Sequence, residues 1–140
     1  MKSDNTISLM ARIHEKINKR LINALKEDGI NDLAPSHADI LAALFKKDRV
    51  TMAAVAKLIH RDKSTVTQLI KKLSQKGYVT IRPNPLDRRS NLVCLTNRGK
   101  TLEAIFQKIS EQLYQIVYAH LRPDEIGQFK RLIRMIDHNL

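Results

Sequence analysis

The fold is decided by residues 51–77, which read TMAAVAKLIHRDKSTVTQLIKKLSQKG. Thr51 is a good N-cap for a first short helix, and the apolar side of that helix consists of Val55, Leu58 and Ile59. Asp62 caps a second helix that runs to about Gln75, with Val66, Leu69, Ile70 and Leu73 at helical spacing. Gly77 is placed as a C-terminal cap. Two short helices joined by a tight turn, His60-Arg61, predict a helix-turn-helix.

The apolar pattern changes after Gly77 from the period of a helix to the period of a strand. Residues 78–82 and 91–95 are rich in β-formers and predict two short strands. Residues 83–90 form the hairpin loop between them, and the adjacent Arg88 and Arg89 lie near its tip. A hairpin directly after a helix-turn-helix predicts the wing of a winged helix-turn-helix.

The positive charge of the chain is confined to this central region. The whole sequence has a formal net charge of +11, and residues 46–100 contain 14 lysines and arginines against 3 aspartates. The two flanks together hold 11 basic and 11 acidic residues, so the entire excess lies in the centre. A basic footprint concentrated on one unit indicates a polyanionic partner, in the first place double-stranded DNA.

Helical patterns flank the central unit on both sides. Before it, an apolar stripe predicts a long helix that ends near Gly29, and Pro35 opens a second helix. After it, Thr96 is placed to cap one long helix, and Pro123 starts a last helix. The predicted fold class is therefore mainly α, with a small β-hairpin wing.

The terminal helices carry more apolar surface than so small a winged domain can cover. We expect one domain, 1–140, in which residues 34–100 form the DNA-binding lobe. Residues 1–33 and 101–140 are then dimerisation helices that pack with the same helices of a second copy. An intramolecular bundle of these helices is the alternative.

Reading DNA requires small polar side chains on the exposed side of the second helix. That side presents Ser64, Thr65, Gln68, Lys71 and Lys72, with Thr67 on its flank. We expect phosphate contacts from four cations, Arg61, Lys63, Lys71 and Lys72. In the wing, Arg88 and Arg89 suit a narrow minor groove, and Asp87 is placed to brace the adjacent arginine.

Several motifs in order resemble the MarR (multiple antibiotic resistance regulator) family. They are KSTVTQLI at 63–70, KGYV at 76–79, DRR at 87–89 and LTNRG at 95–99, preceded by LAPSH at 33–37. The resemblance implies an obligate homodimer, a pseudo-palindromic operator and, in most cases, repression that a small aromatic or lipophilic effector relieves. By position it also implies that Ser64, Thr65, Thr67 and Gln68 read the major groove, that Arg89 enters the minor groove and that Asp87 braces it. His37, Ala34 and Gln68 stand where many members have glutamine, threonine and arginine.

Other classes of function have little support in the sequence. No catalytic constellation, cofactor motif or close metal-ligand spacing is present, and Cys94 has no second cysteine beside it. We therefore expect neither enzyme activity, nor a cofactor, nor a metal site. Without a signal or a spanning segment, the expected location is the cytoplasm, with no membrane partner. An architectural protein that coats DNA without sequence preference is the alternative function.

Overall fold

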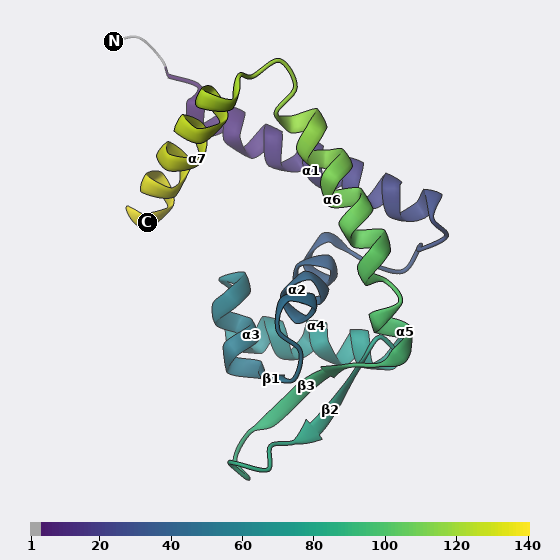
Figure 1. Cartoon of the computed structure of the whole chain (residues 1–140). Coiled ribbons are helices and arrows are strands. Elements are labelled where there is room, and N and C mark those ends of the chain that lie inside the picture. The colour runs from purple at the N-terminus through teal and green to yellow at the C-terminus, as the bar shows by residue number, and fades with distance from the viewer. Residues whose placement is uncertain (1–3) are drawn as a thin grey trace.

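The computed structural model describes residues 4–140, so the first three residues of the expected segment 1–33 lie outside it. The elements along the chain are α1 (Thr6–Glu27), α2 (Pro35–Lys46), β1 (Val50–Thr51), α3 (Met52–Ile59), α4 (Lys63–Gln75), β2 (Val79–Pro83), β3 (Asn91–Leu95), α5 (Asn97–Lys100), α6 (Glu103–Val117) and α7 (Pro123–His138). Figure 1 shows two regions, with α1, α6 and α7 above and α2, α3, α4 and the sheet below.

The predicted helix-turn-helix is present and buries the residues that its periodicity selected. Val55 of α3 and Val66 and Ile70 of α4 are fully buried and belong to one core with the inner side of α2. The caps form as expected, since Thr51 Oγ1 accepts the backbone N–H of Ala54 at 3.1 Å. Leu58 is the exception, because it points outward and is 54% exposed.

The wing is the larger part of a three-stranded antiparallel sheet with strand order β1-β3-β2. Strands β2 and β3 form the predicted hairpin, in which Val79 pairs with Leu95 and Pro83 with Asn91. The two-residue strand β1 was not expected, and it adds to the other edge of β3 by pairing Val50 with Val93. The hairpin extends away from the helices at the bottom of Figure 1.

The prediction of one long helix after Thr96 was wrong. Thr96 caps only the short helix α5, by accepting the Gly99 backbone N–H at 3.1 Å. The carbonyl of Arg98 then accepts the Thr101 hydroxyl at 2.6 Å. The Leu102 N–H, which would bond to that carbonyl in a continuous α-helix, bonds to the Gly99 carbonyl. This change of hydrogen-bond partner interrupts the helix before α6 begins.

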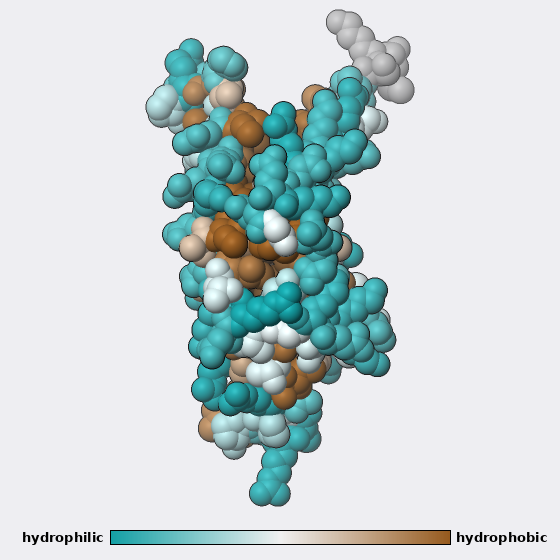
Figure 2. All heavy atoms as spheres, turned by 90° about the vertical axis from the view of Figure 1, so that its right-hand side faces the viewer, coloured by the Kyte–Doolittle hydropathy of each residue, from teal (hydrophilic) through white to brown (hydrophobic). Residues whose placement is uncertain are grey.

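The terminal helices leave long apolar surfaces uncovered. Figure 2 shows apolar side chains gathered in the upper half of the molecule, where α1, α6 and α7 lie. Helix α7 has no buried residue, and its exposed apolar residues are Phe129, Leu132, Met135 and Ile136. Its Lys130 Nζ donates to the Tyr114 hydroxyl of α6 at 2.7 Å, and its Phe129 ring lies 6.1 Å from the Tyr118 ring just beyond the end of α6. Within the described residues α1 packs on α6, but α7 buries none of its side chains, so α7 does not complete an intramolecular bundle.

Candidate nucleic-acid interface

Helix α4 begins with a cap that occupies two of the hydroxyls expected to read bases. Asp62 accepts the Thr65 backbone N–H at 3.0 Å and the hydroxyls of Ser64 and Thr65 at 2.6 Å each. The hydrogen bonds from Ser64 and Thr65 hold the pKa of Asp62 well below its usual range, so the carboxylate is charged at neutral pH. Ser64 and Thr65 thus face a partner as acceptors, which suits the amino groups of adenine or cytosine better than phosphate oxygens.

In the next turn of α4, Thr67 and Gln68 differ in whether their polar groups are already hydrogen-bonded within the protein. The Thr67 hydroxyl donates to the Lys63 carbonyl at 2.8 Å and lies 3.9 Å from the sulfur of Met52 in α3, so Thr67 is turned toward the neighbouring helix. Gln68 is exposed, and within residues 4–140 its side-chain amide makes no hydrogen bond. Its donor and acceptor are therefore both available for a bidentate contact with a base edge.

Four exposed cations surround this helix: Arg61, Lys63, Lys71 and Lys72. Arg61 is fixed by a hydrogen bond to the Ser36 hydroxyl at 3.1 Å, which ties the turn to the start of α2. In the described part of the chain none of the four forms an ion pair with a carboxylate within 4.0 Å, although burial raises the pKa of Asp39 and the nearby Arg61 partly opposes that rise. A surface of this kind attracts phosphates.

The turn between α3 and α4 is made by a non-glycine residue in the left-handed region. His60 has φ 56° and ψ 45°, and the following Arg61 N–H bonds to the Ala56 carbonyl at 3.1 Å. This single residue reverses the chain within two positions and brings Asp62 to the start of α4. His60 is thus a structural turn residue, in agreement with its sequence interpretation.

The wing loop is held in one shape by its own polar groups. Asn84 exchanges hydrogen bonds with both sides of the loop: its N–H donates to the Ser90 carbonyl at 3.3 Å and its side chain accepts the Leu86 N–H at 3.0 Å. Asp87 Oδ1 accepts the Arg89 backbone N–H at 3.0 Å and lies 3.4 Å from its Nε. The Arg89 side chain is nevertheless 93% exposed, so its guanidinium projects from the loop.

The wing and α4, the recognition helix of the helix-turn-helix, border one recess. It is lined by residues of β1, α3, α4, β3 and the wing loop, among them Met52, Lys63, Asn84 and Arg89. Lys63 and Arg89 therefore border the same hollow at the start of α3, together with Asp87. Each of the two predicted DNA-contacting parts thus contributes a cation to this recess.

The sequence interpretation missed two sets of polar contacts that hold the lobe together. Asp48 accepts the Leu95 N–H at 2.9 Å and so fixes β3 to the loop after α2. His37 is buried and its Nδ1 accepts the Ala34 N–H at 3.0 Å, while its Nε2 has no partner. Burial and the nearby Lys76 and Lys72 lower the pKa of His37. The LAPSH stretch gave the one sequence signal, because a histidine there can cap the helix that follows.

The described residues hold neither a metal-binding cluster nor a membrane-spanning helix. Residues 4–140 contain no group of three or more His, Cys, Asp or Glu side chains arranged to hold a metal ion. Cys94 is buried in β3. No helix in the same range has the length and apolar character needed to cross a bilayer.

Known proteins share both the sequence motifs and the architecture. Residues 31–90 match the model of the MarR family. The chain is 29% identical over 124 residues to the multiple antibiotic resistance protein MarR of Escherichia coli K12, covering 83% of this chain and 85% of that protein. It is 32% identical over 101 residues to the HTH-type transcriptional regulator SarZ of Staphylococcus saprophyticus, covering 71% and 66% of the two.

The fold agrees over almost the entire length with a solved member. A crystal structure of an E. coli MarR mutant complexed with operator DNA matches with a TM-score of 0.83 at 26% identity, covering 96% of this chain and 99% of that one. The winged helix-turn-helix and the helices on both sides of it are therefore one shared architecture. By sequence motifs, family match and fold, the chain belongs to the MarR family of transcriptional regulators.

Proposed function

We propose that the chain is a sequence-specific DNA-binding transcriptional regulator that represses as a homodimer on a pseudo-palindromic operator. The observation that carries the proposal is that α4 and the wing present exposed cations, with Lys63 and Arg89 bordering one recess, in a fold that matches a MarR protein complexed with operator DNA. In this proposal α4 enters the major groove with Gln68 toward the bases, and Arg89 reaches the adjacent minor groove.

The roles of the remaining residues follow from their places. Ser64 and Thr65 read base amino groups, and Thr67 packs at the edge of α3. The cations Arg61, Lys63, Lys71 and Lys72, together with Arg88, neutralise phosphates and fix the register of the protein on the duplex. Asp87 braces Arg89 through the 3.4 Å ion pair and the backbone hydrogen bond. Residues 34–100 form the DNA-binding lobe.

The second copy covers the apolar faces of the terminal helices. Exposed apolar side chains occur on all three of them, including Ile13 of α1, Ile116 of α6 and Leu132 of α7. A surface of this extent is typical of a dimer interface, because a monomer in water would leave it hydrated. Segments 1–33 and 101–140 are in this view the dimerisation helices.

A small aromatic or lipophilic effector is proposed to release the DNA. A recess of about 290 Å³ lies between α1 and α6, where Ala24, Ile109 and Leu113 supply apolar walls and Arg20 supplies a cation. These walls suit an aromatic ring, and because Glu27 lines the recess beside Arg20, its charges favour neither an acidic nor a basic substituent. A ligand bound there would favour dimers in which α1 and α6 are displaced, and so would shift the population away from the DNA-binding form.

Membership of a regulator family also indicates whether the chain is an enzyme and which partners it has. We expect a regulator without catalytic activity, because the family to which the chain belongs consists of transcriptional regulators. We also expect it in the cytoplasm, with double-stranded DNA and its own second copy as partners.

Competition binding tests the proposed function. A preferred duplex is first selected from a random library with the full-length protein, and its affinity is then compared with that of a random duplex at physiological salt. The proposal predicts that the selected duplex binds at least ~10³-fold more tightly. Equal affinity for both duplexes would instead identify an architectural protein that coats DNA.

A further inference from the structure

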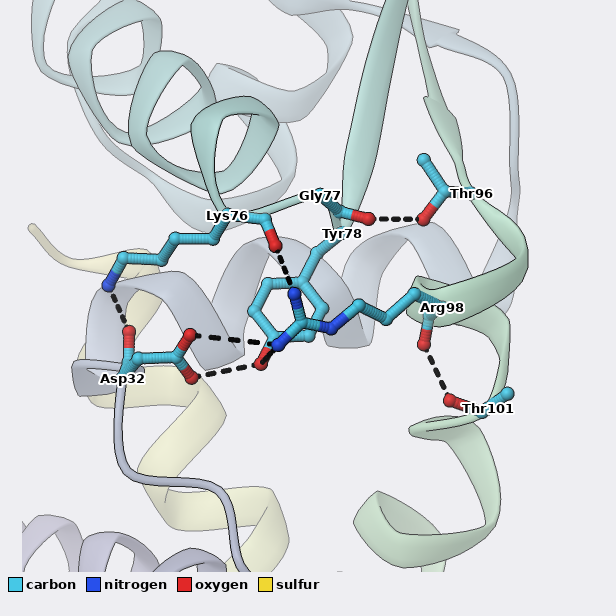
Figure 3. Close-up of polar contacts among 7 residues, drawn as sticks. All are labelled: Asp32, Lys76, Gly77, Tyr78, Thr96, Arg98 and Thr101. Atoms are coloured by element: carbon cyan, nitrogen blue, oxygen red, sulfur yellow. Dashed lines mark hydrogen bonds and ion pairs between the residues drawn. The ribbon is translucent and has the colours of Figure 1, made fainter.

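Four side chains from three segments meet where the recognition helix ends: Asp32, Lys76, Tyr78 and Arg98 (Figure 3). We refer to them as the helix-end cluster. Asp32 lies in the connection between α1 and α2, Lys76 and Tyr78 directly follow α4, and Arg98 lies in α5. The cluster therefore joins three parts of the chain that are distant in sequence.

The side chains of the cluster contact one another closely. The Tyr78 hydroxyl donates to Asp32 Oδ1 at 2.9 Å and accepts from Arg98 Nη2 at 3.2 Å. The Arg98 guanidinium also lies 4.4 Å from the centre of the Tyr78 ring and 4.0 Å from Asp32 Oδ2. Burial and the Asp32 carboxylate raise the pKa of Tyr78, so its hydroxyl keeps the proton that it donates.

The same cluster takes up the carbonyl groups at the end of α4. Arg98 Nη1 donates to the Lys76 carbonyl at 2.5 Å, and the Thr96 hydroxyl donates to the Gly77 carbonyl at 2.6 Å. The Lys76 ammonium in turn donates to the backbone carbonyl of Asp32. A helix end leaves such carbonyls without partners and favours positive charge beside them. The end of α4 is thus attached to the α1–α2 connection on one side and to α5 on the other.

The attachment leaves the end of α4 little room to slide. Gly99 of α5 packs so closely on the Tyr78 carbonyl that a Cβ atom at Gly99 would collide with it. One anchoring segment is the connection that joins α1 to α2, and the other, α5, precedes α6. A displacement of α5 or of the Asp32 segment relative to α4 moves the end of α4 or breaks the cluster.

We propose that the helix-end cluster positions the recognition helix, and that Asp32, Tyr78 and Arg98 thereby set the separation of the two recognition helices in the dimer. The inference rests on the proposed function as a dimeric DNA reader. In this proposal the three residues are positioning residues. They act through α4 on the half-site spacing that the dimer prefers, and they do not themselves contact a base. Breaking the cluster loosens α4 without removing a DNA contact.

The test compares operators that differ only in spacing. Binding of the full-length protein is measured to the selected duplex and to duplexes with one base pair added or removed at the centre. The variants are Asp32→Asn, which weakens the ion pair and the acceptor, and Tyr78→Phe, which removes only the hydroxyl. Asp28→Asn is the matched control, because Asp28 pairs with Lys108 at 2.9 Å between the end of α1 and α6 and does not contact the end of α4.

We expect each cluster variant to bind the selected duplex about threefold to tenfold more weakly, the size of a lost hydrogen bond. The preference for the selected spacing over the altered spacings should shrink, while affinity for random DNA stays unchanged and Asp28→Asn behaves as wild type. An unaltered spacing preference in both variants overturns the inference, as does an equal loss on every duplex together with a lowered melting temperature. If the wild-type protein itself prefers no duplex, the proposed function has failed and not only the inference.

Discussion

At the scale of single residues, the polar side chains of α4 differ in which hydrogen-bonding groups are still free to contact DNA. The hydroxyls of Ser64 and Thr65 donate hydrogen bonds to Asp62, and the Thr67 hydroxyl donates one to the Lys63 carbonyl. Gln68 keeps both its donor and its acceptor and is exposed on the same helix. Gln68 is therefore the residue on which base discrimination depends most.

Replacing Gln68 by alanine tests this assignment. Gln68→Ala should weaken binding to the selected duplex by ~1–3 kcal/mol, because one bidentate base contact is lost. Binding to random DNA should change little, since no phosphate contact is removed. The measurement is fluorescence anisotropy on both duplexes at the same salt concentration. A loss of equal size on random DNA would make Gln68 a positioning residue.

His37 gives the fold a predictable dependence on pH. Its folded-state pKa is lowered, so the folded protein favours the neutral ring, whose Nδ1 accepts the Ala34 N–H. The contribution of His37 is therefore present in full above the ordinary pKa near 6.5 and is lost as the pH falls below it. His37→Gln cannot protonate, and the stability of wild type relative to this variant should decline from pH 7 to pH 5 in urea unfolding. A constant difference over this range would contradict the assignment.

At the scale of elements, the wing loop holds its own shape by internal hydrogen bonds and presents the Arg89 guanidinium. Its loop is closed by hydrogen bonds of Asn84 and Asp87, while the Arg89 side chain stays 93% exposed. The guanidinium is thus oriented before DNA arrives, which lowers the entropy lost on binding.

Arg89→Ala should weaken binding to any duplex and reduce the slope of log affinity against log salt by about 1. The reason is that one cation no longer displaces counterions from the DNA. Affinity measured from low to physiological salt gives the slope. Leu86→Ala is the control in the same loop, because Leu86 is 94% exposed and carries no charge; it should keep the wild-type slope. An unchanged slope for Arg89→Ala would exclude Arg89 from the DNA contacts.

Elements that depend on local signals were predicted from the sequence, whereas those that depend on contacts between distant segments were not. Helices α3 and α4 followed from local signals, since Thr51 and Asp62 each accept an N–H three residues ahead. Strand β1 is too short for a periodic pattern, and it forms because Val50 meets Val93 across the fold. The helix-end cluster was missed for the same reason, because Asp32 and Tyr78 meet only when distant segments pack together. Local signals give elements, whereas contacts of long sequence separation require the tertiary structure.

At the scale of the whole molecule, the chain divides into a charged half and an apolar half. The positive excess lies entirely within residues 46–100, whereas the uncovered apolar side chains are concentrated on α1, α6 and α7. One half is suited to a polyanion and the other to a copy of itself. In the proposed dimer the two recognition helices act together only when the apolar half is paired, so we expect DNA binding to depend on dimerisation.

A glutamate in the apolar half should break this coupling. Met135 is 54% exposed on α7, and Met135→Glu would bury a charge in the dimer interface. We expect a 16.1 kDa monomer in sedimentation at micromolar concentration and the loss of specific DNA binding. Arg134→Glu is the control, because helical spacing places the exposed Arg134 on the face of α7 opposite Leu132 and Ile136. A Met135→Glu dimer with wild-type affinity would contradict the assigned interface.

The most direct test of the whole account is a hydroxyl-radical footprint of the wild-type protein on its selected duplex. Two recognition helices held by one dimer must enter successive major grooves, ~34 Å or about one turn apart. The account predicts two protected windows of equal strength, related by two-fold symmetry and separated by one helical turn. A single window, or uniform protection along the duplex, would contradict it.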